Sequence, residues 1–263
     1  MSTHSYTVHD SVTMTRRSLR HIVRYPSMTL LLVGMPIILL LLFVYVFGGT
    51  LGAGLGGTSG GRAEYVNYVV PGILLITVAA VAQGTAISVA MDMTEGIIAR
   101  FRTMAISRSA VLTGHVVGSM AQTMLGLTVV VGVALPIGFR PTAGPIQWIA
   151  AIGVLAMITF ALTWLSVALG MVSTSVETAS NLPMPLMLLP FLGSGFVPTD
   201  SMPAGMRWFG ENQPFTAFIE TLRGLLMGTP IGDSGLLTTG WCAVIATGGY
   251  LWARGLYNRN SAR

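Results

Sequence analysis

Six long apolar runs divide this chain and leave little of it for any soluble domain. They lie at roughly residues 28–47, 65–90, 116–139, 147–170, 174–197 and 236–253. A helix that crosses the ~30 Å hydrocarbon layer needs about 20 mostly apolar residues, because its backbone polar groups must be satisfied internally there. The runs therefore predict an all-α integral membrane protein with six transmembrane helices. The first run is longer than the ~7 to 15 apolar residues of a cleaved signal peptide, so we expect an uncleaved anchor.

The composition agrees with a membrane protein. The chain is 52% hydrophobic and 9% charged, whereas soluble domains carry about 25% charged residues. All 14 basic residues are arginines and the net charge is +5. A nucleic-acid-binding protein would gather such charge on a soluble module, for which this chain has no room, so we expect no nucleic-acid partner. The single cysteine, Cys242, excludes an internal disulfide framework.

The arginines predict the orientation in the membrane, because positive residues in short loops are retained on the cytoplasmic side. Ten of them precede the first run, lie between the second and third, or follow the sixth. Only Arg62, Arg140, Arg207 and Arg223 fall on the opposite side. Both termini are therefore predicted to be cytoplasmic.

The residues before the first run predict an amphipathic helix along the inner membrane surface, ending at Pro26. Leu19, Ile22 and Val23 recur at helical spacing beside a row of arginines. Two interpretations remain open, namely ordinary positive-inside anchoring and contact with a cytoplasmic partner. The basic residues of this leader are Arg16, Arg17, Arg20 and Arg24.

A second charged stretch, EGIIARFRTMAISRSAVLTGH, occupies residues 95–115 between two apolar runs. At ~100° per residue its apolar side chains share one face of a helix, with arginines beside that face. Such a short amphipathic helix either lies on the membrane surface or docks into a cytoplasmic protein. The residues of the apolar face are Ile97, Ile98, Phe101, Met104 and Ala105.

The fifth run, 174–197, is predicted to be a kinked helix. It opens with TSVE, a capping-box pattern typical of a helix start. Pro183, Pro185 and Pro190 then each delete a helical hydrogen bond. The kink could be a moving part or only an irregularity of packing.

Residues 198–235 are too broken by proline and glycine to span, yet too apolar for a solvated loop. We expect short helices in the outer leaflet, because five apolar side chains share one helical face while Glu220 and Arg223 lie on other sides. The five are Phe215, Phe218, Ile219, Leu222 and Leu226.

Two kinds of energy source are missing from the sequence. Apart from Glu177 in the capping box of the fifth run, none of the six runs contains an Asp, Glu, Arg or His, which argues against an ion-coupled secondary carrier, although a site of backbone carbonyls would escape this test. The chain has no lysine and so no P-loop, which excludes the usual ATPase machinery. Energy from ATP would have to come from another chain.

A weak protease pattern is also present. GTSGG at residues 57–61 fits GxSxG and resembles the serine motif of rhomboid intramembrane proteases. A catalytic Ser59 would need a nearby base, but His4, His9, His21 and His115 are all predicted on the cytoplasmic side. We therefore rank this alternative last.

The leader, the six runs and the segment between the second and third together resemble the permease subunits of type-2 ABC transporters, particularly the daunorubicin-resistance group of exporters. The resemblance covers nearly the whole chain. Its most specific part is GSGFVPTDSMPAGMRWFGENQPFTAFIETLRGLLMG at residues 193–228. The matching positions are Ser194, Gly195, Pro198, Met202, Pro203, Gln213, Pro214, Arg223 and Gly228.

The resemblance implies a coupling helix that inserts into a cleft on a separate ATP-binding subunit, and outer helices that help to close the exit. The coupling positions here are Glu95, Gly96, Arg100, Phe101, Arg102, Ile106 and Arg108. The outer gate positions are Ser194, Gly195, Pro198, Pro203, Gln213, Pro214 and Arg223. Many relatives have a proline near Ala105, which this sequence lacks.

The resemblance further implies a bacterial inner-membrane complex of two permeases, identical or similar, with two ATP-binding subunits that hold ATP and Mg²⁺. This chain would be one permease domain, with a leader at 1–27, a six-span bundle at 28–253 and a cytoplasmic tail at 254–263. It would hold no cofactor and catalyse no reaction. The expected cargo is an amphiphilic or apolar molecule such as a drug, a lipid or a polyketide.

Overall fold

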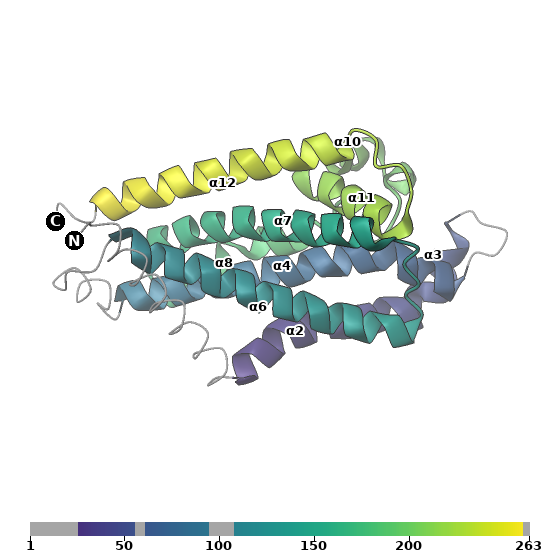
Figure 1. The fold of residues 1–263 in the computed structure, drawn as a ribbon, viewed down its shortest axis with the longest axis horizontal. Helices are drawn as coiled ribbons and strands as arrows, with labels where there is room; N and C mark the ends of the chain where they lie inside the picture. Colours follow the sequence, from purple (N-terminus) through teal and green to yellow (C-terminus); the bar gives the residue numbers. More distant parts are fainter. Residues whose placement is uncertain (1–25, 56–60, 95–107, 260–263) are drawn as a thin grey trace.

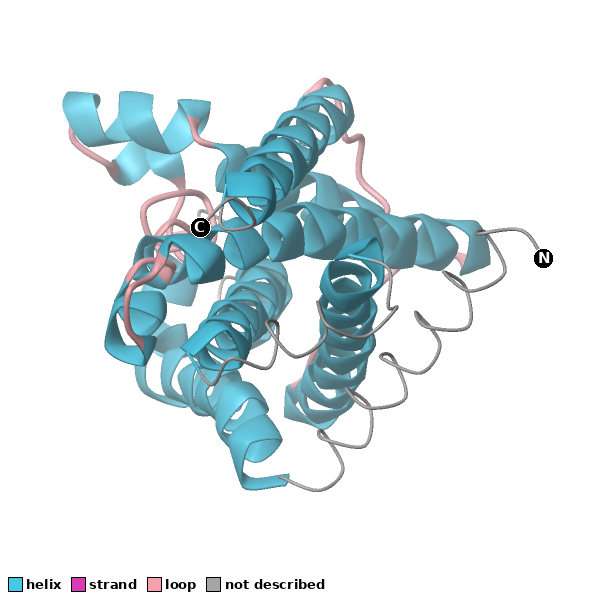
Figure 2. Ribbon diagram, turned by 90° about the vertical axis from the view of Figure 1, so that its left-hand side faces the viewer, coloured by secondary structure: helices cyan, strands magenta, loops and turns pink. Residues whose placement is uncertain are grey.

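The protein is a bundle of helices, and its long helices run side by side along the long axis of the molecule (Figures 1 and 2). The computed structural model describes residues 26–55, 61–94 and 108–259, with side chains described for 32–55, 61–94 and 113–257. Within these ranges there is no β-strand. The all-α prediction is confirmed for this part of the chain.

Five stretches of the described chain are long and apolar enough to cross a membrane. The first joins α2 (Pro26–Leu41), the π-helix η1 (Leu42–Phe47) and α3 (Gly48–Ala53). The others are α4 (Arg62–Thr94), α6 (Arg108–Ile137), α7 (Pro145–Val172) and α12 (Ser234–Arg259). Each is longer than the apolar run that predicted it.

The predicted fifth helix, 174–197, is wrong as a continuous element. Only α8 (Val176–Asn181) and α9 (Met184–Leu188) are helical, and turns follow as far as residue 196. The physical reason is the missing N–H of Pro183, Pro185 and Pro190, which removes three helical donors within eight residues. The helix start is close to the prediction, since Ser175 rather than Thr174 is the N-cap and its hydroxyl accepts from the Thr178 N–H.

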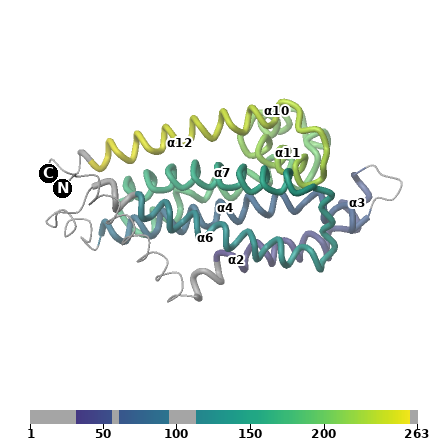
Figure 3. Tube along the Cα trace, in the orientation of Figure 1, coloured from purple at the N-terminus to yellow at the C-terminus, as the bar shows by residue number. Residues whose placement is uncertain are grey.

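The residues after this broken segment form short helices, as predicted. They are η2 (Thr199–Ser201), α10 (Ala204–Asn212) and α11 (Pro214–Met227). All five apolar residues predicted to share a face of α11 are buried. Figure 3 shows α3, α10 and α11 gathered at one end of the bundle, which we call the α11 end.

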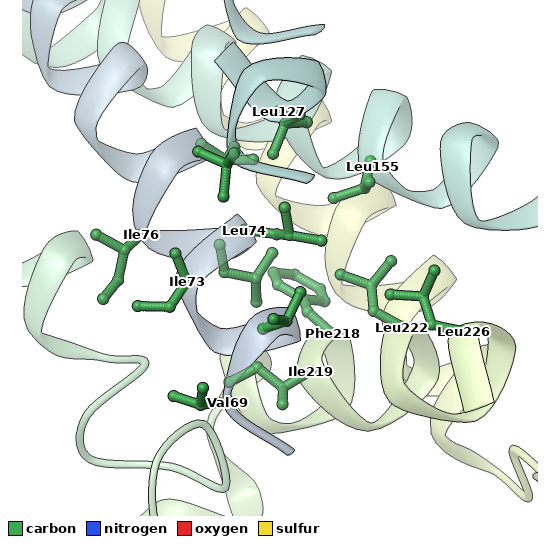
Figure 4. Close-up of a cluster of buried hydrophobic side chains, with 14 of the residues drawn as sticks. Val69, Ile73, Leu74, Ile76, Leu127, Leu155, Phe218, Ile219, Leu222 and Leu226 are labelled. Carbon is green, nitrogen blue, oxygen red and sulfur yellow. The ribbon is translucent and has the colours of Figure 1, made fainter. Parts of the chain in front are cut away.

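Helix α4 lies at the centre of the fold. Every residue from 69 to 82 is buried, which is expected of a helix that is apolar all round. Side chains from α4, α6, α7 and α11 meet in one cluster, seen in Figure 4, and include Ile73, Leu127, Leu155 and Phe218. This core fixes α4 against α11, and so positions the residues at the α11 end.

Two close helix approaches depend on glycine. A Cβ at Gly170 of α7 would lie 2.5 Å from the Ala86 carbonyl oxygen of α4, and one at Gly249 of α12 would lie 2.7 Å from the Leu165 nitrogen of α7. Small residues of this kind let helix backbones pack closely in membrane proteins. These two glycines therefore allow α7 to pack closely on both α4 and α12, but only the fold shows which helices they contact.

Candidate functional site

The broken segment, residues 174–197, is held by side chains that donate to its backbone. The Gln83 amide of α4 donates to the Ser180 carbonyl (2.6 Å), and the Tyr65 hydroxyl of α4 donates to the Phe196 carbonyl (3.2 Å). From α11 and its N-cap, the Arg223 guanidinium donates to the Ser194 carbonyl (2.5 Å) and the Gln213 amide to the Leu189 carbonyl (2.7 Å). Non-helical backbone at membrane depth is tolerated only where such partners exist.

Arg223 joins three parts of the chain at the α11 end. One of its terminal nitrogens donates to the carbonyls of Ser194 (2.5 Å) and Tyr68 (3.3 Å). Its guanidinium carbon lies 3.8 Å from the centre of the Tyr68 ring, a cation–π contact. Burial lowers the pKa of the Arg223 guanidinium from its ordinary value, while the nearby Tyr68 and Glu220 raise it. The arginine thus fastens α11 to α4 and to the turn at residue 194.

Gln213 and Pro214 fix the start of α11. Gln213 is its N-cap and Pro214 its first residue, where the missing N–H of proline costs nothing. A Cβ at position 193 would lie 2.4 Å from the Gln213 amide nitrogen, so a side chain there would displace this amide from the Leu189 carbonyl. The predicted C-terminal glycine, Gly228, ends α11 with a φ of +66°, a backbone conformation that favours glycine.

Gly195 allows the turn to pack on α4. Its own Cβ would lie 2.5 Å from the Pro190 carbonyl oxygen, and a Cβ at Gly72 of α4 would lie 2.8 Å from the Gly195 carbonyl oxygen. A side chain at either position would force backbone atoms apart. The sequence therefore closes this contact between the turn and α4 with two glycines.

Three buried polar atoms at this junction lack a hydrogen-bond partner among the described residues. They are the Ser194 hydroxyl, the Oε1 of Gln213 and the Nε of Arg223. A buried polar atom that stays unsatisfied costs about 1–3 kcal/mol. A rearrangement or a bound polar group can therefore lower the free energy here more than elsewhere in the described core.

A cluster of phenylalanines ties the turn to the π-helix. The ring of Phe43 lies 4.5 Å from that of Phe196 and 6.1 Å from that of Phe191, centre to centre. Phe191 and Phe196 stack at 4.3 Å. Single π-helical turns within membrane helices often mark functional positions. Sequence reasoning did not identify this contact, because it joins residues some 150 positions apart.

The remaining predicted outer positions mark helix boundaries and lie apart from Arg223. Pro198 is the N-cap of η2 and Pro203 that of α10. Between them Asp200 forms an exposed ion pair with Arg207 of α10 (2.6 Å), which also pairs with Glu211 (2.7 Å). Five of the seven predicted outer gate residues meet around the turn and α11, and these two prolines shape the connection.

The predicted coupling and leader residues lie outside the described part. This holds for Arg16, Arg17, Arg20 and Arg24, and for Glu95, Gly96, Arg100, Phe101, Arg102 and Ile106. Arg108 is the first residue of α6, and its side chain is not described. Ser59 also lies outside the described residues. The ends of α4 and α6 bracket the coupling segment.

The prediction that no span holds an ionisable residue is wrong. Because α4 and α6 extend beyond the apolar runs, they include Asp92 and His115, whose side chains meet at 3.1 Å with only 12% and 15% of their areas exposed. The sequence signal was Asp92, two residues after the second apolar run, but that run was predicted to end at residue 90. Among the described residues, no group of three His, Cys, Asp or Glu side chains is placed to hold a metal ion.

Comparison with known proteins decides the family. Residues 10–227, most of the chain, match the ABC-2 type transporter family. The chain belongs to this family. Members of the ABC-2 family are membrane subunits, and the matched region contains the predicted coupling segment (residues 95–108), the broken segment and α11.

This ABC-2 chain is similar to permease proteins whose names refer to drug resistance. It is 28% identical over 256 residues to the daunorubicin resistance ABC transporter permease protein DrrB1 of Streptomyces coeruleorubidus, covering 95% of this chain and 88% of that protein. It is 24% identical over 165 residues to a probable doxorubicin resistance ABC transporter permease protein DrrC of Mycobacterium tuberculosis, covering 61% and 60%. The resemblance to the daunorubicin-resistance permeases is thereby confirmed.

Proposed function

We propose that this chain is the membrane-spanning subunit of an ATP-driven exporter, and that a separate ATP-binding subunit hydrolyses the ATP with Mg²⁺. The observation that carries the proposal is the family match over residues 10–227, since it spans both the coupling segment and the gate residues. The names of the relatives, which refer to daunorubicin and doxorubicin resistance, favour an amphiphilic drug-like cargo. A lipid or a polyketide has the same amphiphilic character.

The broken segment makes the sixth crossing. The chain leaves α7 at Val172 and enters α12 at Ser234 at the α11 end, so residues 173–233 must return along the bundle. The Ser180 carbonyl accepts a hydrogen bond from the Gln83 amide, and the Phe196 carbonyl accepts one from the Tyr65 hydroxyl. These partners lie 18 residues apart on α4, or about 27 Å at 1.5 Å per residue. A distance of that size is close to the thickness of the hydrocarbon layer.

The α11 end is the outer side, and both termini are cytoplasmic. Arg62, Arg140 and Arg223 gather there, through contacts to Tyr45, Asn67 and Tyr68. Arg254 and the start of α6 at Arg108 lie toward the other end. This separation matches the two groups of arginines, and the positive-inside rule then assigns the sides. The location is the bacterial inner membrane, with α10 and α11 in the outer leaflet.

The mechanism is mechanical. Two ATP-binding subunits close on ATP and push the segment 95–108 of two permease copies, since one copy supplies half of the pathway. The ends of α4 and α6 receive this movement, because they bracket the segment. The difference in binding energy between the closed and open states drives the change. At the α11 end, Arg223 and its carbonyl partners hold the exit closed until α4 moves.

The coupling face is tested by co-purification with the ATP-binding subunit. Phe101→Asp should abolish co-purification because it places a charge in an apolar contact, and reversal of Arg100 and Arg102 to Glu should do so through the rim charge. Arg207→Glu, a reversal on the outer side, is the matched control and should leave binding unchanged. Undiminished binding in both coupling variants would contradict the proposal.

The Asp92–His115 pair favours one alternative, an ion-coupled secondary carrier, because ionisable groups within spans are costly and often serve relays. The two functions differ in their energy source. An exporter stops when the ATP-binding subunit is removed, whereas a carrier continues and collapses with the ion gradient. The rhomboid-like protease ranks third, and activity retained in Ser59→Ala would remove it.

A further inference from the structure

An ionisable pair joins the two helices that bracket the coupling segment. The Asp92 carboxylate of α4 lies 3.1 Å from Nε2 of His115 in α6, and both side chains are largely buried. Asp92 lies two residues before the end of α4 at Thr94, and α6 resumes at Arg108. The pair therefore links both helices close to the segment between them. An ionisable pair within membrane spans calls for a functional explanation.

Polar contacts continue from this pair toward the middle of the bundle. The Thr85 hydroxyl of α4 donates to the Ser119 hydroxyl of α6 (2.8 Å), which lies 3.3 Å from the Thr163 hydroxyl of α7. All three side chains are buried. Ser119 follows His115 by four residues, so both lie on one face of α6. We call Asp92, His115, Thr85, Ser119 and Thr163 the polar seam.

Packing alone does not require the polar seam. Replacing a buried ion pair by apolar side chains of similar size is often neutral or stabilising, whereas removing one partner is costly. Such a pair therefore contributes little net stability, but it specifies one arrangement of the helices that carry it.

We propose that the polar seam makes α4, α6 and α7 one rigid body, so that movement of residues 95–107 reaches the α11 end undiminished. Asp92 and His115 are the positioning residues of this body. At its far end α4 carries Tyr68, on which Arg223 stacks. The inference rests on the proposed function, in which an ATP-binding subunit moves that segment.

The first test follows this movement with a single cysteine at the α11 end. Cys242→Ser removes the one native thiol, and Ser201→Cys places an exposed thiol in η2. In whole cells we measure how much ATP trapping with vanadate changes the rate at which an impermeant maleimide labels that cysteine. Asp92→Asn and His115→Gln should reduce this nucleotide response at least about fivefold, while co-purification with the ATP-binding subunit persists.

Matched controls are Thr77→Val and Thr123→Val. Both hydroxyls are buried but donate to carbonyls of their own helices, Ile73 and Ser119. These variants should keep the response of the parent. An undiminished response in Asp92→Asn and His115→Gln overturns the proposal, and so does a parent that binds its ATP-binding subunit without any response at Ser201→Cys. Failure of the parent to bind that subunit refutes the proposed function instead.

The second test restores the link by a different bond. Asp92→Cys and His115→Cys in the Cys242→Ser background, without Ser201→Cys, should lose the response, which is followed here by the rate at which an external protease cuts residues 198–213. A short, reducible thiol cross-linker between them should restore it, and reduction should abolish it again. If cross-linking blocks the response, α4 and α6 must separate during the cycle and the rigid-body proposal is wrong. This test does not require the single variants to fold, because the cross-linked and reduced forms are the same protein.

Discussion

Replacing Arg223 by Ala should destabilise the protein far more than replacing Arg207, although both arginines lie at the α11 end. The guanidinium of Arg223 supplies hydrogen bonds to the carbonyls of Ser194 and Tyr68. Its loss leaves the buried Ser194 carbonyl without a donor, which costs about 1–3 kcal/mol, whereas the Tyr68 carbonyl keeps its helical bond within α4. It also removes a cation–π contact worth roughly 0.5–2 kcal/mol. Allowing for the desolvation cost that the arginine itself carries, we expect a loss of about 2–4 kcal/mol.

The measurement is thermal unfolding of the purified protein, followed by tryptophan fluorescence. At about 2–4 °C per kcal/mol for a chain of this size, Arg223→Ala should lower the Tm by roughly 4–16 °C. Arg207→Ala removes only exposed ion pairs, worth roughly 0.2–1 kcal/mol each, and should lower it by only a few degrees. Equal shifts for the two variants would refute the assignment of Arg223 as the residue that fastens the α11 end.

Three further substitutions test the broken segment. Gly195→Ala should cost about 1–3 kcal/mol, because its Cβ would lie 2.5 Å from a backbone carbonyl oxygen. Gly240→Ala, in open space within α12, should cost nothing and should raise the Tm slightly, because alanine favours the helix over glycine; the two Tm values decide. Gln83→Leu should cost about 1–3 kcal/mol by leaving the Ser180 carbonyl without its donor, and a protease applied to the detergent-solubilised protein should then cut the segment faster. Ser175→Ala removes the N-cap of α8 and should cost about 1 kcal/mol, and a Tm equal to that of the parent would contradict the cap.

Much of the fold follows from local sequence, and the exceptions have identifiable causes. The runs at 65–90 and 147–170 became α4 and α7, because a long apolar stretch in a membrane has the helix as its natural solution. The run at 174–197 was also predicted to span but did not become one helix. Its three prolines were visible, yet whether they kink or break a helix depends on whether Gln83, Tyr65 and the α11 residues are placed to satisfy the backbone.

The outer site was located from the sequence, but its chemistry was not. The pattern around residues 193–228 pointed to Ser194, Gly195, Gln213 and Arg223, and the structure brings all four to one junction. The sequence does not indicate that Arg223 stacks on Tyr68, because the two residues lie some 150 positions apart in the chain. The Asp92–His115 contact was missed for a related reason, since each residue lay just outside an apolar run.

Taken alone, the sequence determined that the protein lies in a lipid bilayer, how many long apolar segments it has and how its arginines are grouped. These properties depend on length, hydropathy and charge along the chain. Tertiary structure decided which helix is central, how the interrupted segment satisfies its carbonyls and where the buried polar residues meet. The reason is that hydrogen-bond partners for proline-broken backbone, and partners for isolated charges in a low-dielectric interior, come from residues far away in the chain. Only the packing of α4 against α6, α7 and α11 brings those residues within reach.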